Sequence, residues 1–368
     1  MYKRQDLPLE DWLFAHTFPL EARFADIDFA SDVWAHMVPT LLSHGTTTAV
    51  YYASIHEPAT TELAATCHRF GQRAFVGRVA MDHPDGTPEW YRDASSSDAI
   101  AASRRSIDSI RSIDGGAGLV HPIVTPRFAP ACTDETMRGL AELAAAEGVL
   151  IQTHCSESDW EHGHAIERFG MSDTEALDSL GLLQPNTVLA HAGHTSPNDW
   201  ARLVQRSAGI AHCPLSNAYF GDAVLPTRRA LDAGVMIGLG TDIAGGSEPG
   251  LLPQCQLAVT SSRMLEDGVD PSVPRDARRT EGQRIDTITA FWMATRGGAD
   301  LLGQPIGLLE VGRRFDAVAV RVDGTGSPLR SWTGVDDAAR TFEKVVRLAR
   351  PADLTDVWVD GRRVAGVG

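Results

Sequence analysis

Five residues that can bind a metal ion or move a proton lie between positions 149 and 246, at or just after the ends of short apolar runs. They are His154, with Glu157 three residues later, His191, His212 and Asp242. A lone histidine at such a position is more often structural than catalytic. The repetition of the pattern favours a functional site over chance placement.

The types of these residues indicate metal-assisted hydrolysis. Neutral imidazole and carboxylate groups bind borderline divalent ions such as Zn²⁺, and a catalytic site keeps one position for water. The bound ion lowers the pKa of that water and so provides a nucleophile near neutral pH. A carboxylate is then needed to carry protons between water, substrate and leaving group. The sequence contains candidates for each of these roles.

Alternating strands and helices must position these residues. Seven strands are predicted between residues 46 and 240, at 46–52, 73–81, 119–125, 149–154, 187–191, 209–213 and 235–240. Helical segments separate them, which indicates βαβ units and a parallel sheet with the polar residues at its carboxyl edge. A helix at 29–42 precedes the first strand without a strand of its own. We therefore expect an α/β fold, a TIM-type (β/α)8 barrel that lacks its first strand.

The character of the sequence changes near residue 306. A turn and a strand are predicted in 306–323, and a strand pair about an Asp-Gly turn in 356–364. We expect these strands to form part of a small β-sandwich unit. The predicted domains are a hydrolase barrel at 1–305 and the C-terminal part of the small β unit at 306–368.

Composition excludes several classes of protein. The formal charge is −15 and the basic residues are scattered in pairs, which argues against a nucleic-acid partner. No apolar run is long enough to span a membrane, and no secretion segment is visible at the N-terminus. Five cysteines without close pairing do not suggest a disulfide framework. We expect a cytoplasmic protein with no membrane partner.

Several longer motifs carry a family resemblance that covers nearly the whole chain. His-Cys-Pro-Leu-Ser-Asn at 212–217 and Gly-Thr-Asp at 240–242 are typical of the metal-dependent aminohydrolase branch of the amidohydrolase superfamily. Thr-Pro-Arg-Phe at 125–128 and Phe-Gly-Gln-Arg-Ala-Phe-Val-Gly at 70–77 are more specific. With these motifs the chain resembles the guanine deaminases.

The resemblance implies hydrolysis of guanine to xanthine and ammonia by a zinc-activated hydroxide, with one zinc ion per subunit of a homodimer. His154 and Asp242 match metal ligands, and Glu157 matches the acid that protonates the purine ring nitrogen. His191 matches the histidine that holds the hydroxide, and Asp242 also takes the proton of the attacking water.

Substrate contacts are implied in the same way. Arg127 and Phe128 match residues that contact the purine, with the guanidinium reading its carbonyl oxygen; a surface ion pair is the alternative for Arg127. His154, Glu157 and Asp242 also face the substrate. His212 either contacts the substrate or orients neighbouring groups.

The chain departs from the family pattern at its N-terminus. In the family, the first strand ends in a His-x-His pair that supplies two further metal ligands, and a glutamine beyond it contacts the base. Here the literal match is His162-Gly163-His164, which we predict to be a solvated helix start, and Gln5 is not that glutamine. We expect an N-terminally truncated sequence that, as it stands, lacks tight zinc binding and is inactive.

Two other functions stay open. A related aminohydrolase could act on an oxidised guanine, a pterin or a triazine, because a shared fold does not fix the substrate. A non-catalytic homologue could use the barrel as a scaffold, although a scaffold does not need the set of His154, Glu157, His191 and Asp242.

Overall fold

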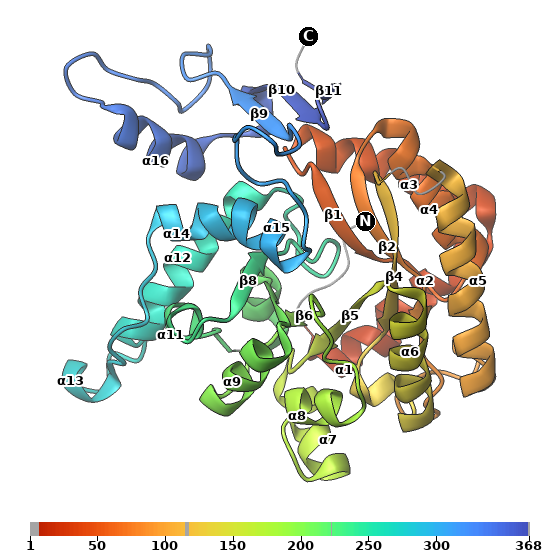
Figure 1. The fold of residues 1–368 in the computed structure, drawn as a ribbon. Helices are drawn as coiled ribbons and strands as arrows, with labels where there is room; N and C mark the ends of the chain where they lie inside the picture. Colours follow the sequence, from red (N-terminus) through yellow and green to blue (C-terminus); the bar gives the residue numbers. More distant parts are fainter. Residues whose placement is uncertain (1–6, 115–117, 222, 367–368) are drawn as a thin grey trace.

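A curved parallel sheet forms the centre of the molecule in the computed structural model, which describes residues 7–114, 118–221 and 223–366 (Figure 1). The strands lie in the order β1-β2-β4-β5-β6-β7-β8, and β3 also pairs with β4. Their bounds are β1 Thr48–Tyr52, β2 Arg73–Gly77, β3 Val79–Ala80, β4 Val120–Pro126, β5 Leu150–Cys155, β6 Val188–His191, β7 Gly209–His212 and β8 Met236–Leu239. The seven predicted strands are confirmed, except that 73–81 forms two strands separated by Arg78.

The sheet curls but does not close within the described residues. Its strand pairs are parallel, and no ladder joins β8 to β1 among the described residues. The result is a half-barrel with an open side, which agrees with the expected barrel lacking a strand. Register brings the carboxyl ends of neighbouring strands level, with His154 beside Ala190 and Cys155 beside His191.

Helices alternate with the strands and cover the outside of the sheet (Figure 1). The larger ones are α3 Ile27–Ser43, α4 Glu57–Phe70, α5 Ser96–Asp114, α6 Asp134–Glu147, α7 Asp159–Phe169, α9 Pro197–Arg206, α12 Leu251–Asp267 and α16 Ala338–Leu348. The shorter ones are α1 Leu9–Trp12, α2 Phe18–Ala22, α8 Asp173–Ser179, α10 Pro214–Ser216, α11 Thr227–Asp232, α13 Arg275–Arg278, α14 Thr287–Trp292 and α15 Gly298–Leu301. Single turns of π- or 3-10 helix lie at 13–17, 23–25, 129–131, 217–221, 293–297 and 351–353.

Local sequence explains where these helices begin. The side chains of Thr133, Ser158, Ser172 and Ser196 accept hydrogen bonds from backbone N–H groups in the first turns of α6, α7, α8 and α9. α6 ends at Gly148, whose φ of 62° is in the left-handed region, so that the chain enters β5 directly.

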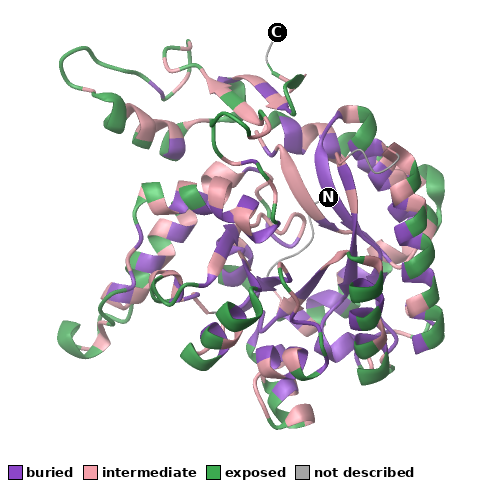
Figure 2. Ribbon diagram, in the orientation of Figure 1, coloured by how far each residue is buried: buried purple, intermediate pink, exposed green. Residues whose placement is uncertain are grey.

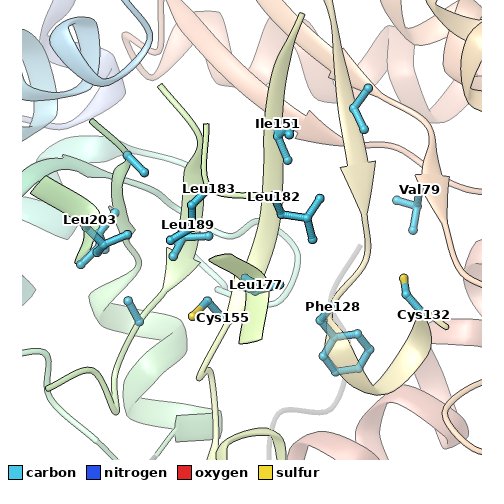
Figure 3. Close-up of a cluster of buried hydrophobic side chains, with 14 of the residues drawn as sticks. Val79, Phe128, Cys132, Ile151, Cys155, Leu177, Leu182, Leu183, Leu189 and Leu203 are labelled. Atoms are coloured by element: carbon cyan, nitrogen blue, oxygen red, sulfur yellow. The ribbon is translucent and has the colours of Figure 1, made fainter. Parts of the chain in front are cut away.

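Apolar side chains fill the space between the sheet and its helices. The strands are largely buried while the outer faces of the helices are exposed (Figure 2). Figure 3 shows part of this core, in which Ile151 and Leu189 from the strands lie near Leu177 and Leu203 from the helices. Burial of each such side chain contributes ~1.5–3 kcal/mol and holds the strand ends in place.

A separate antiparallel sheet lies at the C-terminal end, in the order β11-β10-β9. Its strands are β9 Ala317–Val320, β10 Leu354–Val359 and β11 Arg362–Ala365, and the predicted Asp360-Gly361 turn joins the last two. The sequence analysis did not predict α16, which precedes β10. Within the described chain, no helix has the length and apolar character needed to cross a bilayer.

A buried ion pair connects the two sheets. The Arg73 guanidinium, at the start of β2, donates to both carboxylate oxygens of Asp316, which precedes β9. Both side chains are almost fully buried. Arg73 and Gln72 come from the motif at 70–77, and Gln72 bonds the hydroxyl of Tyr51 and the carbonyl of Thr46. These two motif residues therefore support the fold at a distance from the strand-end cluster.

Candidate functional site

Three of the predicted residues come together at the carboxyl edge of the sheet. Nitrogen or oxygen atoms of His154, Glu157 and His191 all lie within 4.8 Å of one another, a spacing that can hold a metal ion. His191 Nε2 is 3.6 Å from a carboxylate oxygen of Glu157. The rings of His154 and His191 stack with centroids 5.6 Å apart. Strands β5 and β6 position this cluster because they are neighbours in the sheet.

Hydrogen bonds fix the orientation of both imidazole rings. His154 Nδ1 lies 2.6 Å from the carbonyl oxygen of Arg127, and His191 Nδ1 lies 3.0 Å from Oδ1 of Asn217. Since both partners are acceptors, each Nδ1 carries a proton, and in a neutral ring with this tautomer the lone pair is on Nε2. Metal-binding histidines are oriented in this way. Among the described residues, His191 Nε2 has no hydrogen-bond partner although it is buried.

Burial sets the protonation states in the cluster. It raises the pKa of Glu157 to about 7, with a further increase from Asp242 and opposing effects from His191 and Arg127. Burial, followed by the nearby His191, lowers the pKa of His154 to about 3. His154 is therefore neutral near pH 7 and able to act as a ligand, while Glu157 is close to half protonated.

Unusual backbone conformations occur where these strands end. Seven described residues other than glycine have positive φ, and four of them, Ser156, His191, Ala192 and Asp242, lie at the site. Such strain persists only where surrounding structure holds it, and it often marks functional sites. Here the surrounding groups include Glu161 and Asp173.

Two buried carboxyl groups support the turn that carries Glu157. The Glu157 N–H donates to Glu161 at 2.6 Å, and the Ser156 N–H donates to Asp173 at 2.8 Å. Burial raises the pKa of both carboxyl groups, to about 6 for Asp173. Together they anchor the backbone N–H groups of Ser156 and Glu157.

The other predicted residues lie at different depths around a cavity of about 1410 Å³. Arg127, Phe128, His154, Glu157 and Asp242 line it, whereas His191 and His212 are not among its lining residues. His212 is buried at the end of β7, and burial followed by the nearby His191 lowers its pKa to about 3.

Asp242 lines the cavity but stands outside the close cluster of His154, Glu157 and His191. Its carboxylate is packed against Gly245, where a Cβ would lie 2.2 Å from Oδ2. The absence of a side chain at Gly245 therefore makes room for the Asp242 carboxylate.

Arg127 is held by an acid that the sequence analysis missed. Its Nη1 and Nη2 donate to Oε2 and Oε1 of Glu21 at 2.6 and 3.1 Å. An ion pair was the alternative considered for Arg127, but this pair is buried and lines the cavity. Phe128 is also buried and places its ring 6.2 Å from that of His154.

Tyr52, at the carboxyl end of β1, is a second missed residue. Its ring centroid is 4.3 Å from that of His154, and its buried hydroxyl has no hydrogen-bond partner among the described residues. The position of Tyr52 could have indicated this role, because it is a polar residue at the end of the predicted strand 46–52. The other site residues also lie at or just after the ends of strands.

His162 and His164 lie in the first half of α7, as predicted, and neither joins the cluster. Both are partly buried, so the expectation of a fully solvated helix start is too simple. The His162 ring stacks on that of His194 with centroids 5.3 Å apart.

Known proteins are similar to this chain over nearly its whole length. The sequence profile of the amidohydrolase family matches residues 1–364. The probable guanine deaminase of Schizosaccharomyces pombe is 35% identical over 98% of this chain and 67% of its own length. The human guanine deaminase is 34% identical over 98% of this chain and 78% of its own.

A solved structure of a guanine deaminase is also similar to this chain. The crystal structure of guanine deaminase from C. acetobutylicum with bound guanine superposes with a TM-score of 0.86 at 28% identity. The match covers 98% of this chain and 81% of that one. The chain therefore belongs to the amidohydrolase family and, within it, to the guanine deaminases.

Proposed function

We propose that the protein hydrolyses guanine to xanthine and ammonia. The observation that carries this proposal is the cluster of His154, Glu157 and His191, which lies beside Arg127 and Phe128 at one edge of the sheet. The cluster can supply ligands and move protons, and the arginine can recognise a carbonyl oxygen. The guanine deaminases similar to this chain support guanine over other aminopurines.

Zinc is the cofactor we propose, with His154 and Asp242 as its ligands in this chain. The neutral His154 ring, with its Nε2 lone pair, and the carboxylate of Asp242 are a donor set that zinc accepts. When bound, zinc lowers the pKa of a water molecule so that it can attack near neutral pH.

The chain's own residues then move the protons. Glu157, protonated at neutral pH to a useful extent, donates its proton to the purine ring nitrogen while water adds to the amino-bearing carbon. His191 accepts a hydrogen bond from that water through Nε2, and Asp242 takes its proton. Asp242 passes this proton to the amino group, the C–N bond breaks and ammonia leaves. The hydroxyl left on that carbon gives its proton back to Glu157 as it becomes the carbonyl of xanthine.

Substrate recognition is assigned to Arg127 and Phe128. The guanidinium donates to the purine carbonyl oxygen, a geometry that a lysine would not reproduce. The Phe128 ring supplies an apolar wall to the purine. We assign His212 to orienting its neighbours rather than to direct contact, because it is not among the residues that line the cavity.

The test is ammonia release from a panel of guanine, an oxidised guanine, a pterin and a triazine, with zinc in excess. It is run on the 368-residue chain and on the same chain with a guanine deaminase N-terminal segment fused ahead of Met1. Guanine should have the highest kcat/KM, and the fusion should be the faster protein. Another substrate in first place would favour a related aminohydrolase, and no ammonia from the fusion would favour a non-catalytic homologue.

We also propose a cytoplasmic homodimer with two units, 1–305 and 306–368. The five cysteines, all buried and unpaired, are compatible with a reducing compartment. The separate three-stranded sheet supports the division. Light scattering in solution tests the dimer.

A further inference from the structure

The environment of Glu21 differs from that of an ordinary ion pair. Its side chain is 17% exposed and that of Arg127 is 9% exposed, and both line the cavity. One carboxylate oxygen of Glu21 also accepts a hydrogen bond from the Tyr91 hydroxyl, at 3.1 Å. Burial, aided by the charge of Glu21, raises the pKa of Tyr91 well above its usual value, so this hydroxyl keeps its proton and donates.

Helix α2 brings a second contact to the same arginine. Phe18 and Glu21 are three residues apart, so they project from the same face of the helix. The Arg127 guanidinium carbon lies 5.0 Å from the centre of the Phe18 ring. Glu21 therefore holds the edge of the guanidinium while Phe18 covers its face, and the plane of the group is fixed.

The pair leaves the arginine able to bind substrate. A guanidinium has five N–H donors, and the contacts with Glu21 use two of them. A buried guanidinium without a carboxylate partner would bind anionic ligands in preference to neutral ones. The negative charge of the ligand would offset the cost of removing the guanidinium from water. Once Glu21 supplies that negative charge, the free N–H groups suit a neutral acceptor such as a carbonyl oxygen.

We propose that Glu21 is a specificity-determining residue that positions Arg127 to read the carbonyl oxygen of a neutral purine and to disfavour anionic purines. This inference rests on the proposed function, because it takes the purine as the ligand of Arg127. Glu21 itself acts through Arg127 and does not take part in the bond-making steps.

Equilibrium binding to the 368-residue chain, with a chelator present to remove metal ions and so prevent turnover, tests the inference. The ligands are guanine, 2-aminopurine, which lacks the carbonyl oxygen, and urate, an anion at neutral pH. In Glu21→Gln the Kd for guanine should rise about tenfold, while that for 2-aminopurine stays within about twofold. The preference for guanine over urate should fall as well.

The matched control is Glu57→Gln, which breaks an exposed bidentate pair with Arg105 and should leave all three affinities unchanged. Tyr91→Phe is the second variant, since it removes one hydrogen bond from Glu21 and keeps the charge. It should weaken guanine binding by a smaller factor, about threefold. Circular dichroism checks that each variant is folded.

The outcomes separate the two proposals. A wild-type chain that binds none of the purines overturns the proposed function and this inference with it. A wild-type chain that prefers guanine, with the same preference in folded Glu21→Gln and Tyr91→Phe, overturns the role of Glu21 alone. A loss of preference in Glu21→Gln that Glu57→Gln does not share supports it.

Discussion

Replacement of Glu157 by glutamine should change how the stability of the protein depends on pH. Burial raises the pKa of Glu157 from an ordinary 4.5 to about 7 in the folded chain. The folded state therefore keeps its proton over a pH range in which the unfolded chain has lost it. Stability that depends on this proton is fully present below pH 4.5 and is lost as the pH rises through about 7.

The size of the effect follows from that difference in pKa. At ~1.4 kcal/mol per pH unit, a rise from 4.5 to about 7 corresponds to ~3 kcal/mol. Because glutamine cannot ionise, Glu157→Gln removes the loss of stability that ionisation of the buried Glu157 causes. The free energy of unfolding of the variant, relative to wild type, should increase by up to ~3 kcal/mol between pH 4.5 and pH 8.

Urea unfolding at several pH values, with a chelator present to remove metal ions, measures this difference. Glu142→Gln, at an exposed position of α6, is the control and should follow wild type at every pH. Parallel pH profiles for Glu157→Gln and wild type would show that Glu157 ionises normally in the fold. The reasoning that makes it the proton donor would then be wrong.

Three other perturbations test separate parts of the structure. Asp316→Asn leaves the buried Arg73 without its carboxylate partner and should lower the free energy of unfolding by about 3–5 kcal/mol, measured in urea; a value near zero would contradict a structural role for the pair. His154→Ala should raise the Kd for zinc by about tenfold or more in a competition titration, and an unchanged Kd would place the metal elsewhere. Asn217→Ala releases Nδ1 of His191 and should slow ammonia release from guanine about 10- to 100-fold in the fused protein, with the zinc affinity nearly unchanged; wild-type rates would show that the ring orientation does not matter.

Strand-end patterns predicted the centre of the site well, for a physical reason. Parallel strands end at the same edge, so polar residues at those ends must converge when the strands are neighbours. This explains why His154 and His191, on adjacent β5 and β6, are stacked. The same rule cannot tell how deep each side chain lies, which is why the sequence left open whether His212 contacts the substrate or orients neighbouring groups.

Local sequence patterns could not predict residues whose roles depend on contacts with residues far away in the sequence. Glu21 is 106 positions from Arg127 in the sequence, and nothing in the local spacing of either residue indicates the pair. Glu161 and Asp173 were not singled out from the sequence, although both are fully buried and accept hydrogen bonds from the turn at Ser156 and Glu157. The motif at 70–77 was informative about family, but the roles of Gln72 and Arg73 in packing appear only when the Tyr51 and Asp316 contacts are known.

In the proposed function, Arg127 would serve both metal binding and substrate recognition, one through its backbone and the other through its side chain. Its carbonyl oxygen orients His154, while its side chain pairs with Glu21. The Arg127 N–H bonds the carbonyl of Ala80, and this contact anchors the backbone independently of the side chain. A change at Glu21 should therefore alter the guanidinium and leave His154 in place. We therefore expect that Glu21→Gln changes purine selectivity without changing zinc affinity, although both proposed functions involve Arg127.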